Sequence, residues 1–274
     1  MKITQLTYPL IFAFALSGCT NLASVKQYSE TANSSLAQVP SVFKDFSGSC
    51  ERRAEYYPEK HQPDCTGLQS KEKPLKEVVS VLQSYVKSLG QLADDDKITF
   101  SKDIDALEKE IKGLDKLDSE QVAAVSTVAK YLSKLATDGY RRNVVKTTLK
   151  ENDAQVKTIT DTLTEIIQRD YDELLELEKS AAIKYYRGIE AKYGKTEPLA
   201  VMIKMQEREE KLATLQEKVK AIKPLTMLLS KVQQGHHQLT VKSDELDSDE
   251  VIELVKGFVK DSKPVIELIK DAYQ

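Results

Sequence analysis

The residue types that most often carry covalent or metal chemistry are scarce in this 274-residue sequence. It has three cysteines and three histidines, which are Cys19, Cys50, Cys65, His61, His236 and His237. Cys50, His61 and Cys65 suggest a zinc site, but zinc sites use three or four ligands and commonly a paired CxxC spacing. Because that pairing is missing, we expect no metal and no other cofactor, either here or at His236 and His237.

Signatures of catalysis are also missing from the sequence. It contains no GxSxG, no HExxH and no glycine-rich phosphate loop. Its 43 Asp and Glu residues could form a close pair by chance, but none stands in an apolar context typical of a catalytic acid. The acidic run at residues 94–96 lacks the arrangement of a calcium-binding EF-hand loop. We therefore expect no enzyme and no catalytic residues.

The first eighteen residues have the three parts of an export signal. Lys2 is the only charge, an apolar run covers residues 8–16, and Ser17 and Gly18 are small residues before a cleavage point. The apolar run is too short to cross a bilayer, which takes about 20 helical residues. We expect residues 1–18 to be a signal peptide.

The residues Leu16-Ser17-Gly18-Cys19 resemble the lipobox of bacterial lipoproteins. In that family the cysteine thiol is joined to diacylglycerol, the signal is cut before the cysteine, and the new amine is acylated. The resemblance implies that Cys19 is lipidated and that its acyl chains anchor the protein. Because Thr20 follows instead of Asp, it also implies the outer membrane, and we expect the periplasmic face. The alternative is an ordinary secretory signal with a chance cysteine.

Lipidation of Cys19 would leave Cys50 and Cys65 as an even pair in an exported protein. An oxidising compartment favours a disulfide between them over the zinc alternative. The bond would close a short loop that contains Pro58 and Pro63 and has no clear periodicity. We expect a compact stapled lobe.

The composition favours long helices over a sheet-based fold. There are only 10 Gly, whereas 30% of the residues are charged and 41% are hydrophobic. A net charge of −3 provides no basic footprint for nucleic acid, which we do not expect as a partner. The expected fold is an all-α, elongated helical bundle.

Apolar residues recur every three or four positions in several segments, which predicts helices. The segments are 21–46, where Pro40 should end or kink the helix before a short helical turn; 74–90, beginning at Pro74; 98–111; and 120–135, with Ser119 as N-cap. Towards the C-terminus, 236–248 is a predicted linker. Two short helices, 251–256 and 265–270, should flank a break at 261–264.

Two longer segments carry apolar seams whose steps alternate between three and four, as in a coiled coil. The first seam is Val156, Ile159, Leu163, Ile166, Asp170, Leu174 and Leu177, and the second is Leu212, Leu215, Val219, Ile222, Leu225, Leu229 and Val232. Both are symmetric about Gly194. This symmetry predicts a long antiparallel hairpin that pairs Leu177 with Leu212, Leu163 with Leu225, and Val156 with Val232.

One seam position is polar. Asp170 could fix the register of the hairpin as a buried acid. Alternatively the helix rotates slightly and Tyr171 takes the core position, which is the interpretation that we favour.

The predicted hairpin tip is the main candidate for a binding site. Its apolar residues exceed the seam, and Tyr and Met are common at recognition surfaces. The candidate residues are Ile183, Tyr185, Tyr186, Ile189, Tyr193, Leu199, Met202 and Met205. The alternatives are that the tip packs against the helices of 74–135 or only widens the core. Tyr56 and Tyr57 could likewise form a patch or pack on the stapled loop.

The segments suggest five parts, with boundaries at 1–18, 19–72, 73–150, 151–235 and 236–274. They are the signal peptide, the anchored N-terminal helix with the disulfide loop, a short-helix bundle, the hairpin, and the linker with the C-terminal helices. The leading hypothesis is a non-enzymatic envelope lipoprotein that binds another envelope protein as scaffold, adaptor or assembly factor. One alternative is an immunity or inhibitor lipoprotein that neutralises a toxin or lytic enzyme. The other is an envelope enzyme acting on peptidoglycan or lipid.

Overall fold

The computed structural model describes residues 22–94, 112, 117–138 and 144–273, and the predicted helix at 98–111 lies outside them. Helices dominate this described part, which contains no strand, so the all-α class is confirmed. In chain order the helices are α1 (Ala23–Leu36), α2 (Val39–Ala54), the short η1 (Glu59–His61), α3 (Thr66–Ala93), α5 (Ser119–Asp138), α6 (Val144–Glu165), the π-helical η2 (Ile166–Tyr171), α7 (Asp172–Tyr193), α8 (Pro198–Val241) and α9 (Asp249–Tyr273).

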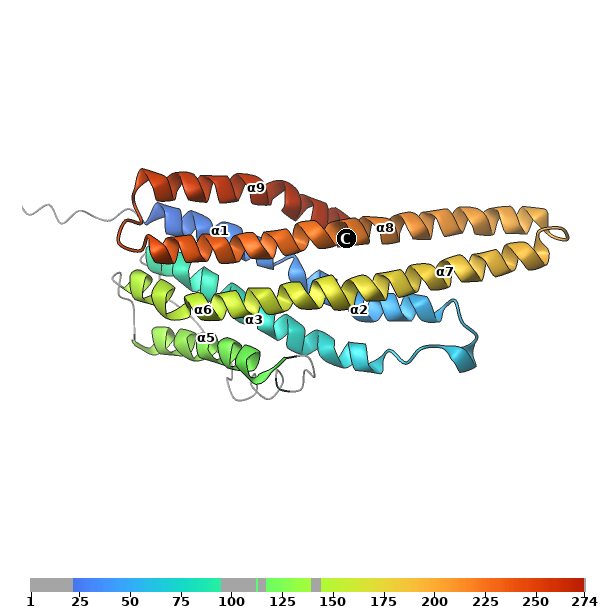
Figure 1. Ribbon diagram of the computed structural model, residues 1–274, viewed down its shortest axis with the longest axis horizontal. Coiled ribbons are helices and arrows are strands. Elements are labelled where there is room, and N and C mark those ends of the chain that lie inside the picture. Colours follow the sequence, from blue (N-terminus) through green and yellow to red (C-terminus); the bar gives the residue numbers. More distant parts are fainter. Residues whose placement is uncertain (1–21, 95–111, 113–116, 139–143, 274) are drawn as a thin grey trace, which may run out of the picture.

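The helices lie roughly along one long axis (Figure 1). α1 packs against α3, α8 and α9, α2 packs against α3 and α7, and α5 packs against α3 and α6. A continuous cluster of buried apolar side chains, from Leu22 to Ile269, joins these contacts into one core. α7 and α8 project beyond the other helices at the end opposite the start of α1 (Figure 1).

The projecting end is formed by the connection between α7 and α8. The Gly194 N–H donates to the Glu190 carbonyl at 2.9 Å, and the Glu197 N–H donates to the Tyr193 carbonyl at 2.8 Å. A Cβ at position 194 would lie 2.6 Å from the Glu190 carbonyl oxygen, so this turn needs glycine. α8 then runs back beside α7 and α6 (Figure 1).

The π-helical turn η2 changes the phase of the rod that α6, η2 and α7 form. A π-turn holds an extra residue compared with an α-turn, so every later side chain is rotated about the axis. Val156, Ile159, Leu163 and Ile166 are buried as predicted, but beyond them the buried residues include Ile167, Tyr171, Leu175 and Glu178 instead of Asp170 and Leu177. Tyr171 therefore takes the core position instead of Asp170, which confirms the favoured interpretation. The predicted seam position of Leu177 is wrong, because that side chain is exposed instead of facing Leu212.

Two of the predicted helix starts are displaced. α3 begins at Thr66, directly after Cys65, and Pro74 lies inside it. The N-cap of α5 is Asp118 and not Ser119. Its Oδ1 accepts the N–H of Gln121 at 2.8 Å, and the Gln121 side chain accepts the N–H of Asp118 at 3.0 Å, which is a capping box. The predicted break near Pro40 lies at residues 37–38, and Pro40 is in the first turn of the second helix, which is the full helix α2 and not a short turn.

The C-terminal part is more helical than predicted. α8 continues through the first six residues of the predicted linker and ends at Val241. The two short helices predicted beyond it form the single helix α9, with Pro264 inside. Phe258 and Ile266 lie on the same buried face on either side of the proline. Packing of this continuous face outweighs the backbone hydrogen bond that the proline cannot make.

α1, α8 and α9 meet at a close contact around Tyr28. The Tyr28 hydroxyl donates to the Val232 carbonyl at 2.7 Å, and its ring packs against Phe258 with centroids 5.4 Å apart. A Cβ at position 235 would lie 2.7 Å from Cε2 of Tyr28. Gly235 therefore lets the ring lie directly against the backbone of α8, which is why this helix tolerates a buried glycine.

Gly235→Ala should destabilise the protein, although alanine normally favours a helix. The Tyr28 ring is pinned on both sides, so the new methyl overpacks the core at a cost of about 1–3 kcal/mol. Gly257→Ala in α9 is the matched control, because its Cβ would meet no atom within 4 Å. It should stabilise by about 0.5–1 kcal/mol. Chemical denaturation of both variants measures the difference, and equal effects of the same sign would contradict this account.

Candidate partner-binding surfaces

A disulfide staples the region below the projecting end. Cys50 at the end of α2 and Cys65 just before α3 are bonded, with an S–S distance of 2.01 Å. The predicted disulfide is thus present, and it excludes the zinc alternative at Cys50, His61 and Cys65. No group of three His, Cys, Asp or Glu side chains among the described residues could hold a metal ion. The loop that the bond closes carries Tyr56 and Tyr57.

Tyr56 joins this loop to α7. Its ring centroid lies 5.6 Å from that of Tyr185 and 6.1 Å from that of Tyr186, and the rings of Tyr185 and Tyr186 are 5.2 Å apart. Lys211 of α8 places its ammonium 5.4 Å from the Tyr56 centroid. These contacts, which we call the tyrosine cluster, form a second small core with Ala181 and Ala182.

A hydrogen bond ties the tyrosine cluster to α8. The buried Tyr186 donates its hydroxyl proton to Glu207 Oε1 at 2.8 Å, and Lys204 donates to Glu207 Oε2 at 2.7 Å. The bonds from Lys204 and then Tyr186 lower the pKa of Glu207 to about 2. Glu207 is therefore ionised at neutral pH and holds Tyr186 in one orientation.

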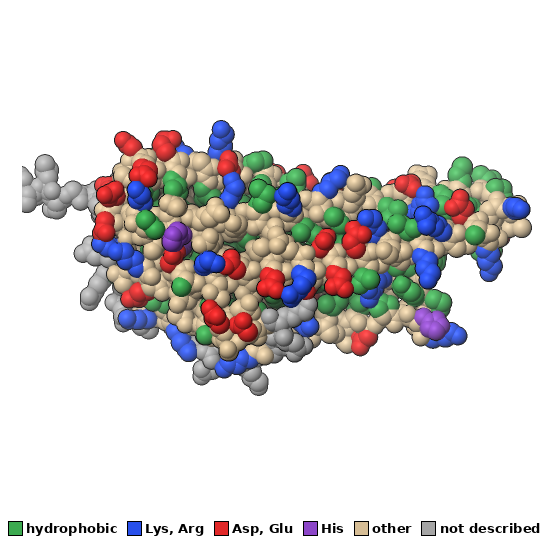
Figure 2. Space-filling view, in the orientation of Figure 1, with side chains coloured by type: hydrophobic (Ala, Val, Ile, Leu, Met, Phe, Trp, Pro, Cys, Tyr) green, Lys and Arg blue, Asp and Glu red, His purple; other side chains and the backbone are tan. Residues whose placement is uncertain are grey.

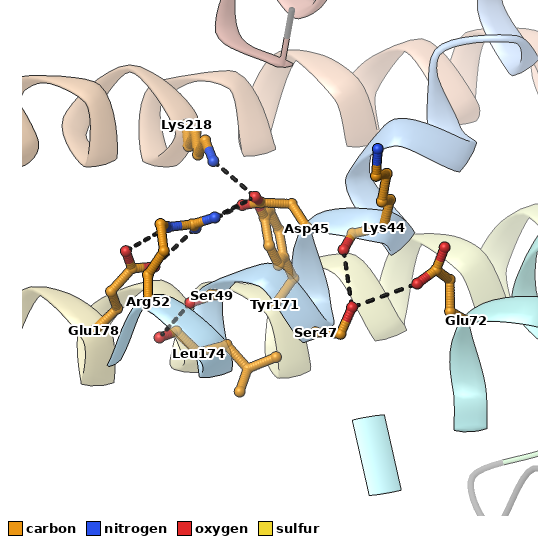
Figure 3. Close-up of polar contacts among 10 residues, drawn as sticks. All are labelled: Lys44, Asp45, Ser47, Ser49, Arg52, Glu72, Tyr171, Leu174, Glu178 and Lys218. Carbon is orange, nitrogen blue, oxygen red and sulfur yellow. Dashed lines mark hydrogen bonds and ion pairs between the residues drawn. The ribbon is translucent and has the colours of Figure 1, made fainter. Parts of the chain in front are cut away.

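Charged side chains from three elements form a clamp beside this cluster (Figure 3). Asp45 of α2 accepts hydrogen bonds from Arg52 Nη1 at 2.8 Å, from Lys218 Nζ of α8 at 2.7 Å and from the Tyr171 hydroxyl at 2.6 Å. Arg52 Nε also donates to the buried Glu178 of α7 at 2.7 Å. Burial alone would raise the pKa of Asp45, but the three donors outweigh it and hold the pKa below its usual value.

This charged clamp was not predicted. Glu178 occupies a core-facing position only because η2 rotates α7, and nothing in the local pattern of the sequence marks that rotation. Its carboxylate is buried and satisfied by the Arg52 fork, which is the arrangement that a buried ion pair requires. The clamp fixes α2, and with it the stapled loop, against α7 and α8.

Large apolar side chains are exposed beside the clamp and the staple. Tyr57, Leu177 and Tyr185 are 38%, 43% and 40% exposed, and we call them the flank patch. Leu177 also lines a hollow of about 180 Å³ with other mainly apolar side chains, which include Leu68, Leu75, Leu174 and Phe46. Of the three flank-patch residues, Leu177 is the one that borders this concave apolar surface.

A second exposed set lies at the end of the projection. Tyr193, Leu199, Met202 and Ile203 are 37%, 72%, 62% and 62% exposed, and we call them the apex. Figure 2 shows apolar and basic side chains gathered there, at the right-hand end of the molecule.

The structure separates the eight predicted tip residues into three groups. Tyr193, Leu199 and Met202 belong to the apex, and Tyr185 belongs to the flank patch. Ile183, Ile189 and Met205 are partly buried and Tyr186 is buried, so these four support the tip from inside. The alternative that the tip packs against the helices of 74–135 is wrong for the apex, which projects past α3 (Figure 1).

A cluster around His236 has the residue types of a catalytic relay. Its Nδ1 lies 2.9 Å from Asp153 Oδ1, and its Nε2 lies 2.7 Å from the hydroxyl of Tyr85, which donates to the Thr148 carbonyl at 3.2 Å. His237 also bonds to Asp153, at 2.7 Å. His236 is completely buried, so its predicted place in a polar linker is wrong. A substrate could reach this ring only if the bundle opened, and the cluster serves to join α3, α6 and α8.

No protein-family model, curated protein or solved structure matches this chain. No helix among the described residues has both the length and the apolar character needed to cross a membrane. Function is therefore inferred from the chain's own surfaces.

Asp45→Ala should destabilise the protein by about 3–5 kcal/mol, because it leaves the largely buried Lys218 without its carboxylate partner. Asp161→Ala is the control, since Asp161 pairs with Lys157 on an exposed helix surface. That change should cost less than about 1 kcal/mol. Equal losses for the two variants in urea unfolding would show that the clamp contributes no more than a surface pair.

Acid should weaken the bundle through His236. Burial lowers the pKa of His236 despite the opposing effect of Asp153, so the folded state keeps the ring neutral. An unfolded histidine gains a proton below about pH 6.5, and the free energy of unfolding then falls by up to about 1.4 kcal/mol per pH unit. Denaturation at pH 7.5, 6.5 and 5.5 measures this fall, and this window lies above the lowered pKa of Asp153. His236→Gln should flatten the dependence; an equally steep fall in that variant would assign it to other groups.

Proposed function

We propose that this chain is a lipid-anchored, non-enzymatic scaffold of the bacterial cell envelope that binds another envelope protein through its flank patch. The lipobox resemblance at Leu16-Ser17-Gly18-Cys19 supports the anchor and an outer-membrane location facing the periplasm. Cys19 precedes the described Leu22 by three residues, which span at most about 10 Å. Lipidation there would hold the start of α1 close to the bilayer, with the flank patch further out along the bundle.

The observation that carries the proposal is the exposed Tyr185 held by a rigid support. Exposed aromatic side chains that are already fixed lose little conformational freedom on binding, and tyrosines are enriched among residues that dominate interface energies. Tyr56 and Tyr186 fix one side of the Tyr185 ring, while the staple and the charged clamp fix Tyr56. The adjacent hollow beside Leu177 would accept an apolar side chain of the partner.

Site-specific photocrosslinking tests this proposal. Benzoylphenylalanine replaces Leu177 or Tyr185 in the full chain, and Met227 and Leu268 serve as control positions because they are also exposed apolar residues. In cells that produce the chain naturally, discrete protein adducts should form at 177 and 185 and not at 227 and 268. Tyr56→Ala should reduce the adduct at 185, because it removes the support of that ring.

The anchor is tested in the same cells. Cys19→Ala should move the chain out of the membrane fraction and should reduce the adducts, because the partner is then no longer concentrated nearby. Absence of adducts at 177 and 185, or equal adducts at all four positions, would overturn the flank patch as a docking site. Unchanged membrane retention of Cys19→Ala would overturn the lipid anchor.

A further inference from the structure

The apex is amphipathic in a way that the flank patch is not. Leu199, Met202 and Ile203 are spaced three and four residues apart and share the outward face of the first turns of α8. Val201 and Met205 occupy the opposite face and turn toward the core side, where Met205 packs on the tyrosine cluster. The outward apolar face therefore makes no packing contribution to the folded tip.

The apex is also the most basic part of the projection. Residues 183–206 contain five Lys or Arg and two Glu, a net charge of +3 in a chain whose total is −3. Lys184, Arg187 and Lys195 are exposed, and none of them pairs with a carboxylate among the described residues. Most of the bundle differs, because many of its lysines form ion pairs along the helices. These three apex cations surround an apolar face and lack carboxylate partners in the described part of the chain, so they favour the binding of an anionic ligand.

The shape of the apex limits the kinds of ligand that it could bind. Four hollows among the described residues, the best-formed one included, are lined by residues outside the apex, and Figure 2 shows the apex as a convex end. A convex apolar end needs a matching groove or a deformable apolar medium. The apex matches the layers of a bilayer interface. Its aliphatic residues suit the acyl chains, its tyrosine suits the headgroup level, and its long basic side chains suit the phosphates.

We propose that the apex docks on an anionic lipid bilayer opposite the membrane that holds Cys19. Leu199, Met202 and Ile203 enter the boundary between headgroups and acyl chains, Tyr193 lies at headgroup depth, and the surrounding cations contact lipid phosphates. It rests on the lipid anchor at Cys19 proposed above, and it goes beyond the flank patch, which uses other residues and another class of partner. The protein then spans the gap between two lipid surfaces.

The choice of an opposing bilayer follows from the two ends of the molecule. α1 begins at the end opposite the apex (Figure 1), and α8 alone is 44 residues, or about 66 Å, long. The turn between α8 and α9 lies at the α1 end and is acidic, with five acids and one lysine in residues 242–250. An anionic bilayer would attract the apex and repel that acidic end, so only the apex end of the bundle suits such a surface.

A vesicle-bridging assay with the full lipidated chain tests this proposal. The chain is reconstituted in phosphatidylcholine vesicles, which are then mixed with fluorescent, protein-free vesicles containing about 30% phosphatidylglycerol, enough to give a negative surface potential. Flotation of the first population should carry the second with it, whereas protein-free vesicles of pure phosphatidylcholine should remain behind. High salt should weaken the bridging because it screens the cations.

Insertion of the apex is measured separately with a tryptophan reporter. The chain contains no Trp, so Leu199→Trp places a single tryptophan at the apex. Its emission should move to shorter wavelength when the anionic vesicles are added. Val241→Trp is the control at the other end of α8, where the side chain is similarly exposed, and its emission should stay constant.

Two sets of substitutions separate the apolar and the charged contributions. The triple change Leu199→Gln, Met202→Gln and Ile203→Gln should reduce bridging at least about tenfold. The triple change Lys184→Glu, Arg187→Glu and Lys195→Glu should reduce it on the order of 100-fold. These positions are exposed, so thermal unfolding should change little in both variants. The controls are Met227→Gln with Leu268→Gln, and Lys150→Glu with Lys223→Glu and Lys263→Glu, which should bridge like the native chain.

Three results would overturn the proposal. The first is a native chain that does not bridge vesicles, together with a Leu199→Trp variant whose emission does not shift. The second is bridging that persists in both apex variants, since another surface would then hold the lipid. The third is an apex that crosslinks to a protein in cells while it ignores anionic vesicles, which would assign it to a protein groove. None of these results depends on the flank patch, whose crosslinks at 177 and 185 are a separate measurement.

Discussion

The packing of the distal half of the molecule depends on the extra residue in the π-helical turn η2. It turns Tyr171 of η2 and Glu178 of α7 toward α2, where Tyr171 bonds to Asp45 and Glu178 bonds to Arg52. The same rotation turns Leu177 out of the core toward the surface hollow. One irregular turn therefore both closes the charged clamp and exposes part of the flank patch, which fits the frequent use of π-turns at functional positions.

The sequence indicated the fold class and the place of the turn, because helical period and glycine chemistry are local signals. The predicted seam is correct as far as Ile166 and wrong at Asp170 and Leu177. A π-turn cannot be recognised from residue types, so the sequence does not predict the change of phase. Pro264 misled for the opposite reason. It is a local signal to break a helix, and burial of Phe258 and Ile266 on either side of it in α9 overrides that signal.

The sequence predicted the candidate site as a set of apolar residues. It did not predict which of them are exposed and which support the site from inside. That division depends on contacts between distant segments, above all Tyr56 with Tyr186 and Arg52 with Glu178, which are separated by more than 100 residues. Polar side chains that cross the core, such as Tyr28 and Tyr85, show the same limit. Their hydroxyls find partners on other helices, so nothing in the neighbouring sequence reveals that they are satisfied.

The unbroken helix α8 gives the molecule a mechanical character. It runs from the apex to the far end as one helix, with Pro224 inside it, and α6, α7 and α9 lie along its sides. A pull on its first turn is carried as tension along the helix and resisted as shear against these neighbours. Many side-chain contacts then share the load at once, instead of opening one after another as in a peeled interface. Such a body resists tension along its length better than a bundle whose helices can be peeled apart one at a time.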